Sequence, residues 1–368
     1  MTIPWYVWCA IFSVTSAMIG AHWDISWHRA IGRDSFWTPA HIAIYLCGVL
    51  GGLSCAYLIF SRTFRWVDDP AVISMWGFKA PLGAFIAAWG GVAMLTSAPF
   101  DDWWHNAYGL DVKIVSPPHV LLIFGSGMVM LGALMLILGR MNRADGELKR
   151  RLTLCYLYVG AMLIVLLMIL LMEFSERTQM HRAGFYQKLA VAIPVVLAGI
   201  ARASGVRWGA TLTAAIYTAF LLGCIWILPL FPAEPKLGPV YYPTKQFVPP
   251  PFPPLFLVPA IALDLLWQRT ARWNKWLLGA VSGLVFLALL AAVQWRFAEF
   301  LMSPASRNWI FGTHIFGYYT HPQSYLFRNV FLPTEPDFWR GMAIAAAFAM
   351  LSARLGLGWG DWMRKIRR

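Results

Sequence analysis

Long apolar runs separated by short polar segments dominate the chain. A helix needs about 20 apolar residues to cross a bilayer, whereas the strands of a membrane barrel alternate apolar and polar residues over about ten positions. The runs here are continuous, so they predict an all-α, polytopic membrane bundle of about ten transmembrane helices. We expect these helices at residues 3–22, 39–60, 75–97, 118–139, 152–173, 186–201, 209–230, 254–267, 276–296 and 338–356.

Composition supports the same class of protein. Of the 368 residues, 59% are hydrophobic and only 13% are charged, whereas soluble domains carry about 25% charged residues. The mean hydropathy is +0.59. These values exclude an ordinary soluble domain.

Basic residues gather in compact clusters after every second predicted helix. The clusters are SRTFR, RMNRADGELKRR, ARASGVR, QRTARWNK and RKIRR. Basic loops stay in the cytoplasm, so this alternation predicts a protein of the cell (inner) membrane with both termini cytoplasmic. The net charge of +13 then reflects topology, with attraction to anionic lipid headgroups as a by-product. It is no argument for a nucleic-acid partner.

Two polar stretches resemble each other and lie on the predicted periplasmic side. HWDISWHRAIGRDSFWTPAH, residues 22–41, aligns with PFDDWWHNAYGLDVKIVSPPH, residues 99–119, at an offset of 77 residues between the first aligned aspartates. The aligned pairs are Asp24 with Asp101, His28 with His105, Asp34 with Asp111, and His41 with His119. We therefore predict a duplicated metal-site domain over 1–140, with repeats at about 20–60 and 97–139. Residues 141–368 would add further helices with Pro-rich and aromatic outer loops.

Each copy has ligands at a spacing that suits a metal ion. Asp and His four residues apart share one face of a helix. The second His follows a helix-start signal, Thr38-Pro39 or Ser116-Pro117, which places it in the first turn of the next helix. Two His and one carboxylate suit copper or iron, and zinc is not excluded. The predicted metal ligands are Asp24, His28, His41, Asp101, His105 and His119.

Several alternatives stay open at this stage. Asp34 and Asp111 are equally suited to bind the metal directly or to orient a ligand His. Asp102 competes with Asp101, and only the alignment favours Asp101. The alternative to metal binding in both stretches is that these His and Asp residues lie at the membrane interface and cap helix ends. Weaker candidates are better explained by salt-bridged helix ends or aromatic interface packing; they are Glu173, Glu176, His181, His314 and His321.

At these residues the chain resembles the C subunit of the particulate methane and ammonia monooxygenases, a family of copper membrane monooxygenases. The copper motif of that family, Asp-x3-His-x12-His, is met by Asp24, His28 and His41. A second family motif, Asn-x3-His-x13-His, is matched in spacing by Asp101, His105 and His119, with Asp in place of Asn. The resemblance covers about residues 20–140.

The resemblance implies an oxidoreductase with two copper sites that hydroxylates a small apolar substrate with dioxygen. Asp24, His28 and His41 would then be the catalytic set. Other monooxygenase subunits, or further copies of this chain, are the implied protein partners within the lipid bilayer. The alternative from another class is a non-enzymatic membrane protein for copper binding, assembly or transport. Transport would favour polar ligands near the middle of the membrane, whereas these lie near one surface.

Overall fold

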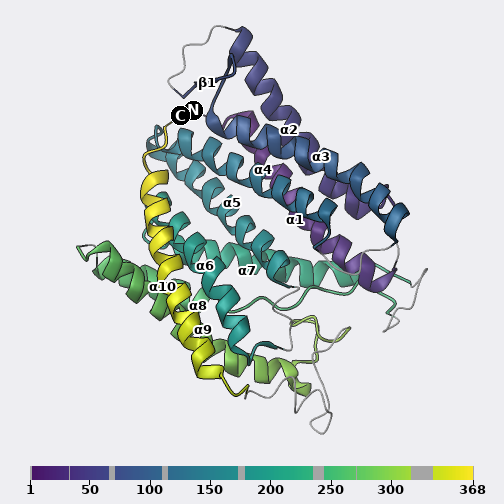
Figure 1. Ribbon diagram of the computed structural model, residues 1–368, viewed down its shortest axis with the longest axis vertical. Helices are drawn as coiled ribbons and strands as arrows, with labels where there is room; N and C mark the ends of the chain where they lie inside the picture. Colours follow the sequence, from purple (N-terminus) through teal and green to yellow (C-terminus); the bar gives the residue numbers. More distant parts are fainter. Residues whose placement is uncertain are drawn as a thin grey trace. The chain divides into compact units, whose positions relative to one another are not determined.

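The computed structural model describes residues 2–32, 34–65, 71–109, 115–172, 179–234, 244–270, 272–315 and 335–367. Within them the chain forms ten α-helices and one short β-hairpin (Figure 1). The helices are α1 Trp5–Ala30, α2 Pro39–Phe64, α3 Leu82–Tyr108, α4 Pro117–Met141, α5 Gly146–Met172, α6 Ala183–Ser204, α7 Gly209–Ile227, α8 Leu257–Arg269, α9 Lys275–Met302 and α10 Phe338–Met363.

Eight of the described helices are long and apolar enough to cross a membrane, and α1 and α8 are the two that fall outside this set. α8 has 13 residues, which extend only about 20 Å at 1.5 Å per residue, less than the apolar thickness of a bilayer. α1 has 26 residues and is long enough, but no stretch of it is apolar enough to meet the same condition. The mainly helical architecture is confirmed and agrees with a membrane bundle, and the number of ten spans stays a prediction.

Residues 73–80 are a hairpin, so the prediction of a helix beginning at 75 is wrong. Strands β1 (Ile73–Met75) and β2 (Phe78–Ala80) pair antiparallel, and the turn between them uses positive φ at Trp76 and Gly77. A short apolar run is compatible with a strand as well as with a helix. Only the turn at Trp76 and Gly77 distinguishes the hairpin from a helix here. The helix begins at Leu82, directly after Pro81.

Most helices extend beyond their predicted runs by a few residues, and three of the differences bear on the polar stretches or on the number of spans. α1 and α3 continue to Ala30 and Tyr108, so that polar residues occupy their last turns. α8 begins at Leu257, after prolines at 253 and 254 that lack the N–H of a helix interior. The first two extensions carry Asp24 and His28, and Asp101 and His105, onto regular helix.

The chain divides into two compact units. The first comprises Met1–Leu166, Glu234–Pro243 and Met363–Arg368, and the second comprises Leu167–Ala233 and Thr244–Trp362. In the first unit, glycines bring the helices close together. A Cβ on Gly90 of α3 would lie 2.7 Å from the carbonyl oxygen of Gly125 on α4, and one on Gly91 would lie 2.6 Å from the Cα of Gly52 on α2. Small residues of this kind allow close packing of membrane helices.

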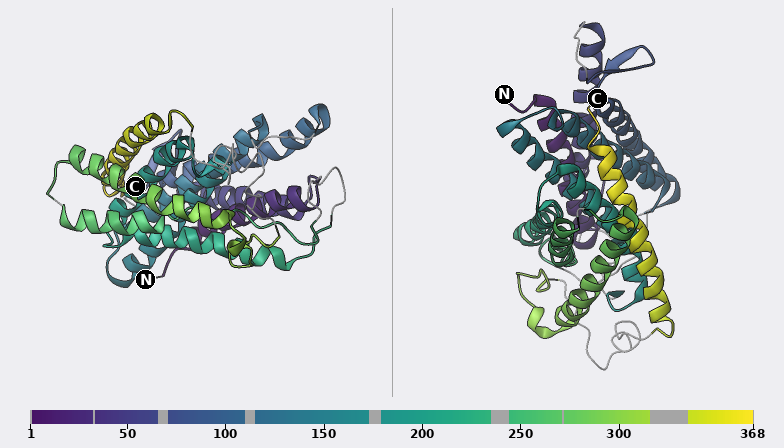
Figure 2. Two further views of the ribbon diagram at one scale, coloured as in Figure 1. Left: turned by 90° about the horizontal axis from the view of Figure 1, so that it is seen from below. Right: turned by 90° about the vertical axis from the view of Figure 1, so that its left-hand side faces the viewer.

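Both ends of the chain lie at one end of the first unit (Figure 2). The Asn142 side chain, after α4, donates hydrogen bonds to the carbonyl oxygens of Met363 (3.0 Å) and Ile366 (2.7 Å). Thr2 and Pro4 line a cavity together with the α4–α5 connection. Asp24 and His28 on α1, Asp101 and His105 on α3, and His119 on α4 lie at the opposite ends of these helices.

The second unit is held by an aromatic core and by a few buried polar contacts. Phe256 packs against Tyr217 and Phe286, with ring centroids 5.4 and 6.3 Å apart. Asp264 of α8 accepts hydrogen bonds from the backbone N–H groups of Ala210 (3.2 Å) and Thr211 (2.7 Å) at the start of α7. This buried carboxylate therefore caps a helix, which is a structural use.

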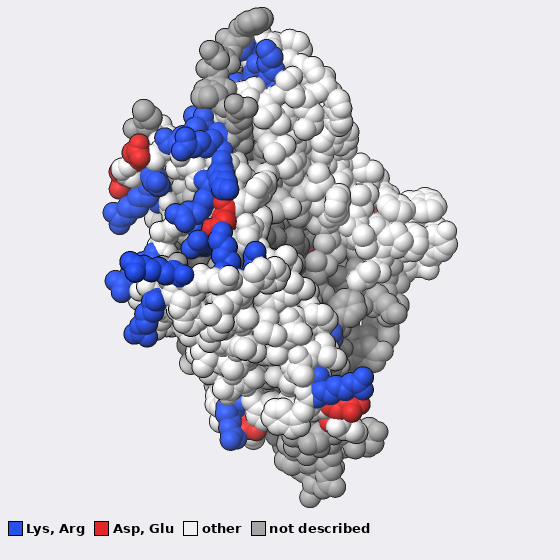
Figure 3. All heavy atoms as spheres, turned by 60° about the vertical axis from the view of Figure 1, so that its left-hand side comes forward, with Lys and Arg blue, Asp and Glu red and all other residues white. Residues whose placement is uncertain are grey.

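The surface separates charged from apolar regions. Lys and Arg side chains gather in clusters and leave a broad area without charged groups (Figure 3). Many large apolar side chains are exposed on the molecule, including Phe12, Leu53 and Phe124. Exposed apolar surface of this extent is expected where helices face lipid.

Candidate metal centres

The last two turns of α1 present a carboxylate and an imidazole on one face. Asp24 and His28 are one turn apart, and their Oδ2 and Nε2 atoms are separated by 3.7 Å. The His28 side chain is 45% exposed, and Asp24 is 20% exposed. The i,i+4 spacing read from the sequence therefore places both groups together.

His41 reaches the same place from the first turn of α2. Its Nε2 atom lies 3.1 Å from Oδ1 of Asp24. Thr38 occupies the N-cap position of α2 as expected, but its hydroxyl makes no capping bond to the helix. It accepts instead from the backbone N–H of Ser35 at 2.8 Å, so it fixes the loop that precedes the helix.

That loop carries a second carboxylate into the group. Oδ2 of Asp34 lies 2.8 Å from Nε2 of His41 and 3.3 Å from Nε2 of His28. The Asp34 side chain is only 7% exposed. Burial alone would raise its pKa, but hydrogen bonds and attraction from the two histidines hold the pKa of Asp34 well below its usual range. Asp34 is therefore an anionic oxygen donor at neutral pH. We call Asp24, His28, Asp34 and His41 the first cluster.

The second cluster consists of Asp101, His105 and His119. Oδ2 of Asp101 lies 3.5 Å from Nε2 of His105, and Oδ1 lies 3.5 Å from Nε2 of His119. One potential ligand atom from each of the three residues lies within 4.8 Å of the others. In the first cluster, Asp24, His28 and Asp34 meet the same condition.

Local contacts orient the histidines of the second cluster. Nδ1 of His105 lies 3.3 Å from the carbonyl oxygen of Gly109. A carbonyl only accepts, so this contact puts a proton on Nδ1, and Nε2 is the ring atom that faces Asp101. A hydrogen bond from the ring nitrogen opposite the ligating one is common in metal-binding histidines. Ser116 caps α4 as predicted, because its hydroxyl accepts from the backbone N–H of His119 at 3.4 Å.

Asp102 is not part of this group. Its backbone carbonyl and its carboxylate both contact the side-chain amide of Asn106, at 2.8 and 3.4 Å. Asp101 instead faces both histidines. The geometry thus agrees with the alignment in selecting Asp101.

One cavity of about 370 Å³ touches both clusters. Asp34 and His41 line it from the first cluster, and Asp101 and His105 line it from the second. The remaining lining residues are Ser35, Phe36, Tyr45, Ala98, Asp102 and Asn106. The two groups of potential ligands therefore border the same space.

Tyr45 is a cavity residue that the sequence reasoning missed. It lies one turn after His41 on α2, and its ring is 5.9 Å from the His41 ring and 5.3 Å from the Phe36 ring. The four-residue spacing from His41 was the available signal, since it places both side chains on one face of the helix.

The first cluster has the donor atoms that a metal ion would need. Oδ1 of Asp24 is buried and makes no hydrogen bond to any described residue, although His41 Nε2 is close. A buried carboxylate oxygen without a hydrogen bond lowers the stability of the fold unless another group, such as a metal ion, binds it. Mixed imidazole and carboxylate donors suit copper, iron or zinc. The residues present therefore fit a divalent transition metal.

The weaker candidates divide into those described and those outside the described residues. Nε2 of His181 lies 3.0 Å from the carbonyl oxygen of Trp295, and the two rings pack edge to face, so His181 has a structural role. His314 is exposed and belongs to neither cluster. Asp111, Glu173, Glu176 and His321 lie outside the described residues.

Comparisons with known proteins give no further information about function, so the two clusters are the main indication of it. No protein-family model, no curated protein and no solved structure matches the chain.

The two neighbouring aspartates of α3 provide a test of the second cluster. Asp101→Ala should remove about one metal equivalent, because this carboxylate contacts both histidines, whereas Asp102→Ala should leave the metal content unchanged. Loss of a ligand or of its supporting group commonly lowers metal affinity by about ten-fold to a hundred-fold. Metal analysis of both purified variants after mild chelation checks this. Equal losses in the two variants would contradict the assignment of Asp101.

Proposed function

We propose that the chain is a copper-dependent membrane monooxygenase, or a component similar to the C subunit of one, that hydroxylates a small apolar substrate with dioxygen. The observation that carries this proposal is the pair of His and carboxylate clusters that border one cavity. The match of both ligand spacings to the copper motifs of the methane and ammonia monooxygenases supports copper over iron or zinc.

In this proposal, Asp24, His28 and His41 hold the reactive metal, as the family motif implies. Asp34 adds a second anionic oxygen to that group. Asp101, His105 and His119 hold the other metal, either as a partner centre or as an electron relay. Bound copper would supply one-electron redox chemistry and the activation of dioxygen.

The overall reaction needs an external reductant. One oxygen atom enters a C–H or N–H bond of the substrate and the other leaves as water, which consumes two electrons and two protons. The side chains described around the cavity include no two-electron donor, so the electrons would come from a membrane quinol or a partner protein. Further subunits, or copies of this chain, are therefore part of the proposal.

The size and setting of the cavity fit a small substrate. A volume of about 370 Å³ lies at the lower end of the range for small-molecule sites. The surrounding helices expose apolar side chains, so a substrate dissolved in lipid can approach the unit laterally. Short alkanes, alkenes and ammonia are the substrates to try first.

A non-enzymatic copper-binding or assembly protein is the second candidate, and the first cluster favours it. Four side chains converge there, and a site closed by four protein ligands is typical of structural metal sites, whereas catalytic sites keep a position open. Transport is less well supported, because the clusters lie at helix ends.

Labelled dioxygen separates the two candidates. Membranes containing the copper-loaded protein and a reductant should incorporate labelled oxygen into product with at least one small substrate, and chelated membranes should not. If copper is bound and can be reduced, but no labelled oxygen enters product above the level of the chelated control, the result would support the binding protein and overturn the monooxygenase.

Membrane orientation is a separate prediction of the same proposal. In a cysteine-free background, Ala144→Cys should react with an impermeant thiol reagent only after the cells are opened, because the basic α4–α5 connection is expected in the cytoplasm. Glu234→Cys should react in intact cells. The reverse pattern would place both clusters on the cytoplasmic face and contradict the proposed periplasmic chemistry.

A further inference from the structure

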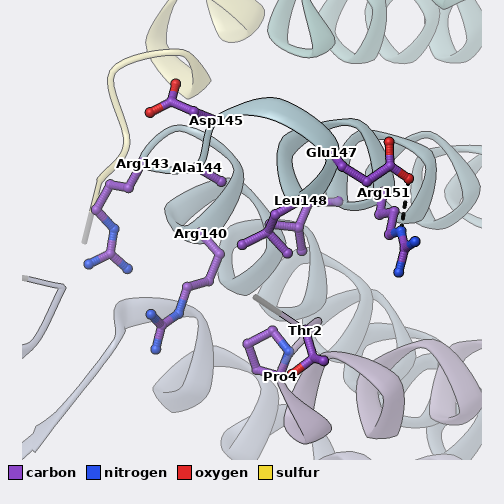
Figure 4. Close-up of a pocket in the computed structure, with 10 residues that line it drawn as sticks. Thr2, Pro4, Arg140, Arg143, Ala144, Asp145, Glu147, Leu148 and Arg151 are labelled. Atoms are coloured by element: carbon purple, nitrogen blue, oxygen red, sulfur yellow. Dashed lines mark hydrogen bonds and ion pairs between the residues drawn. The ribbon is translucent and has the colours of Figure 1, made fainter.

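The cavity that both clusters border, which we call the shared cavity, is distinct from a larger cavity at the end of α4. The larger cavity has a volume of about 710 Å³ and lies between the N-terminal segment and the α4–α5 connection (Figure 4). Within its lining, Glu147 pairs with Arg151 at 2.9 Å. Neither cluster contributes a residue to it. The side chains that can meet a ligand beside the clusters are therefore those that line the shared cavity.

Most polar side chains that line the shared cavity outside the clusters already have hydrogen-bond partners. The Ser35 hydroxyl lies 3.4 Å from the hydroxyl of Thr38. The side-chain amide of Asn106 donates to the backbone carbonyl and to the carboxylate of Asp102, at 2.8 and 3.4 Å. These donors are engaged within the protein, and the two apolar lining residues have none to offer.

Tyr45 supplies the remaining side-chain donor of the lining outside the clusters. Its hydroxyl makes no hydrogen bond to any residue that the structure describes. The side chain is half-buried, and a tyrosine hydroxyl in such a place usually finds a partner. A phenol carries one proton that it can donate. A ligand in the shared cavity can therefore accept a hydrogen bond from Tyr45.

The position of Tyr45 brings this donor close to both clusters. The residue follows His41 by one turn of α2, so the two side chains share a face of the helix. Its ring centroid lies 5.9 Å from that of His41 and 5.3 Å from that of Phe36. Its hydroxyl interacts electrostatically with Asp101 of the second cluster and with Asp34 of the first. Tyr45 is therefore placed to act on a ligand that lies between them.

A donor at this place suits a small ligand with a free lone pair. The carboxylates of the clusters alone would repel an anion, but divalent ions held by the clusters would offset that charge. A hydroxyl that donates to an anion forms a shorter and stronger hydrogen bond than one that donates to a neutral group. A small anion is therefore the ligand that gains most from the Tyr45 hydroxyl.

We propose that Tyr45 is a further ligand-binding residue of this site, whose hydroxyl donates a hydrogen bond to a small anion held in the shared cavity. Fixed donors of this kind stabilise negative charge at a reacting centre. The inference rests on the metal centres of the proposed function. It is independent of whether the chain oxygenates a substrate.

Azide titration of the copper-loaded, full-length protein tests this without substrate or reductant. The charge-transfer absorption of azide on copper(II) gives the affinity. Tyr45→Phe keeps the ring and its packing but removes the donor. We expect its azide affinity to be lower by about tenfold or more, because the loss of a hydrogen bond to a charged group commonly has an effect of this size. Its copper content should equal that of wild type.

Two controls separate the hydrogen bond from a general disturbance of the clusters. Tyr57→Phe makes the same change on α2 at a residue that is 56% exposed and outside the lining of the shared cavity, so its azide affinity should equal that of wild type. Carbon monoxide binds reduced copper but accepts hydrogen bonds poorly. Its affinity should be the same in wild type and in Tyr45→Phe, whereas disturbed clusters would bind both ligands more weakly.

Several results would overturn the proposal. Unchanged azide affinity in Tyr45→Phe, or wild type that holds copper but binds no azide, would show that the hydroxyl meets no anion. An equal loss of azide and carbon monoxide affinity, or a loss of copper, would show that Tyr45 only supports the clusters. Protein that cannot be loaded with copper would remove the metal centres and this proposal together. A clear azide difference without any labelled-oxygen incorporation would refute the monooxygenase and leave this role of Tyr45 in place.

Discussion

Asp24→Ala is expected to abolish the reductant- and oxygen-dependent formation of product in membranes. Asp24 contacts both histidines of the first cluster, at 3.7 and 3.1 Å, so its loss removes a ligand and leaves the histidines less well placed. We expect labelled-oxygen incorporation to fall at least about a hundredfold, to the level of a chelated control. The measurement compares wild type and variant at equal protein content.

Asp101→Asn is the matched variant at the second cluster. It keeps an oxygen donor and introduces the Asn of the motif that this stretch resembles in spacing, so under the proposed function it should retain part of the activity. Asp102→Asn, outside both groups of ligands, should retain nearly all of it. Full activity in Asp24→Ala would show that the first cluster is not the reactive one.

His41→Ala is expected to remove about one metal equivalent and leave the second cluster filled. His41 Nε2 lies within 3.1 Å of Asp24 and 2.8 Å of Asp34, so the variant loses the imidazole that joins the two carboxylates. Affinity at this cluster should fall by about a hundredfold. Metal titration of the purified variant against a chelator of known affinity checks this.

His105→Ala is the reciprocal variant and should empty only the second cluster. Both clusters line the same cavity, which makes a further outcome informative. If either variant alone removes all bound metal, the residues form one shared centre in place of two. If both variants keep the wild-type metal content, none of these histidines is a ligand.

Much of the arrangement around the clusters was predictable from local sequence rules. The Asp-x3-His spacing forces both side chains onto one helix face, and Ser116-Pro117 starts α4 where the capping preference predicts. The long apolar runs located the helices because each needs about 20 residues to cross a bilayer. Such rules depend only on neighbours in the chain.

The remaining features depend on contacts between distant segments. The sequence left Asp34 open as a ligand or a supporting residue, because residue spacing does not show whether the loop between α1 and α2 brings this carboxylate to both histidines. The shared cavity requires α2 and α3 to lie side by side. The glycines at 52 and 91 allow this close approach, but their positions in the sequence do not predict which helices pack together. The hairpin at 73–80 was missed because its strands are too short to show alternation.

Metal content with electron paramagnetic resonance, on protein isolated in native membranes, tests the central claim most directly. The account predicts about two copper ions per chain, with nitrogen hyperfine structure from histidine that weakens in His41→Ala and disappears when His105→Ala is added. Native protein that contains no copper, or copper signals that both substitutions leave unchanged, would contradict it.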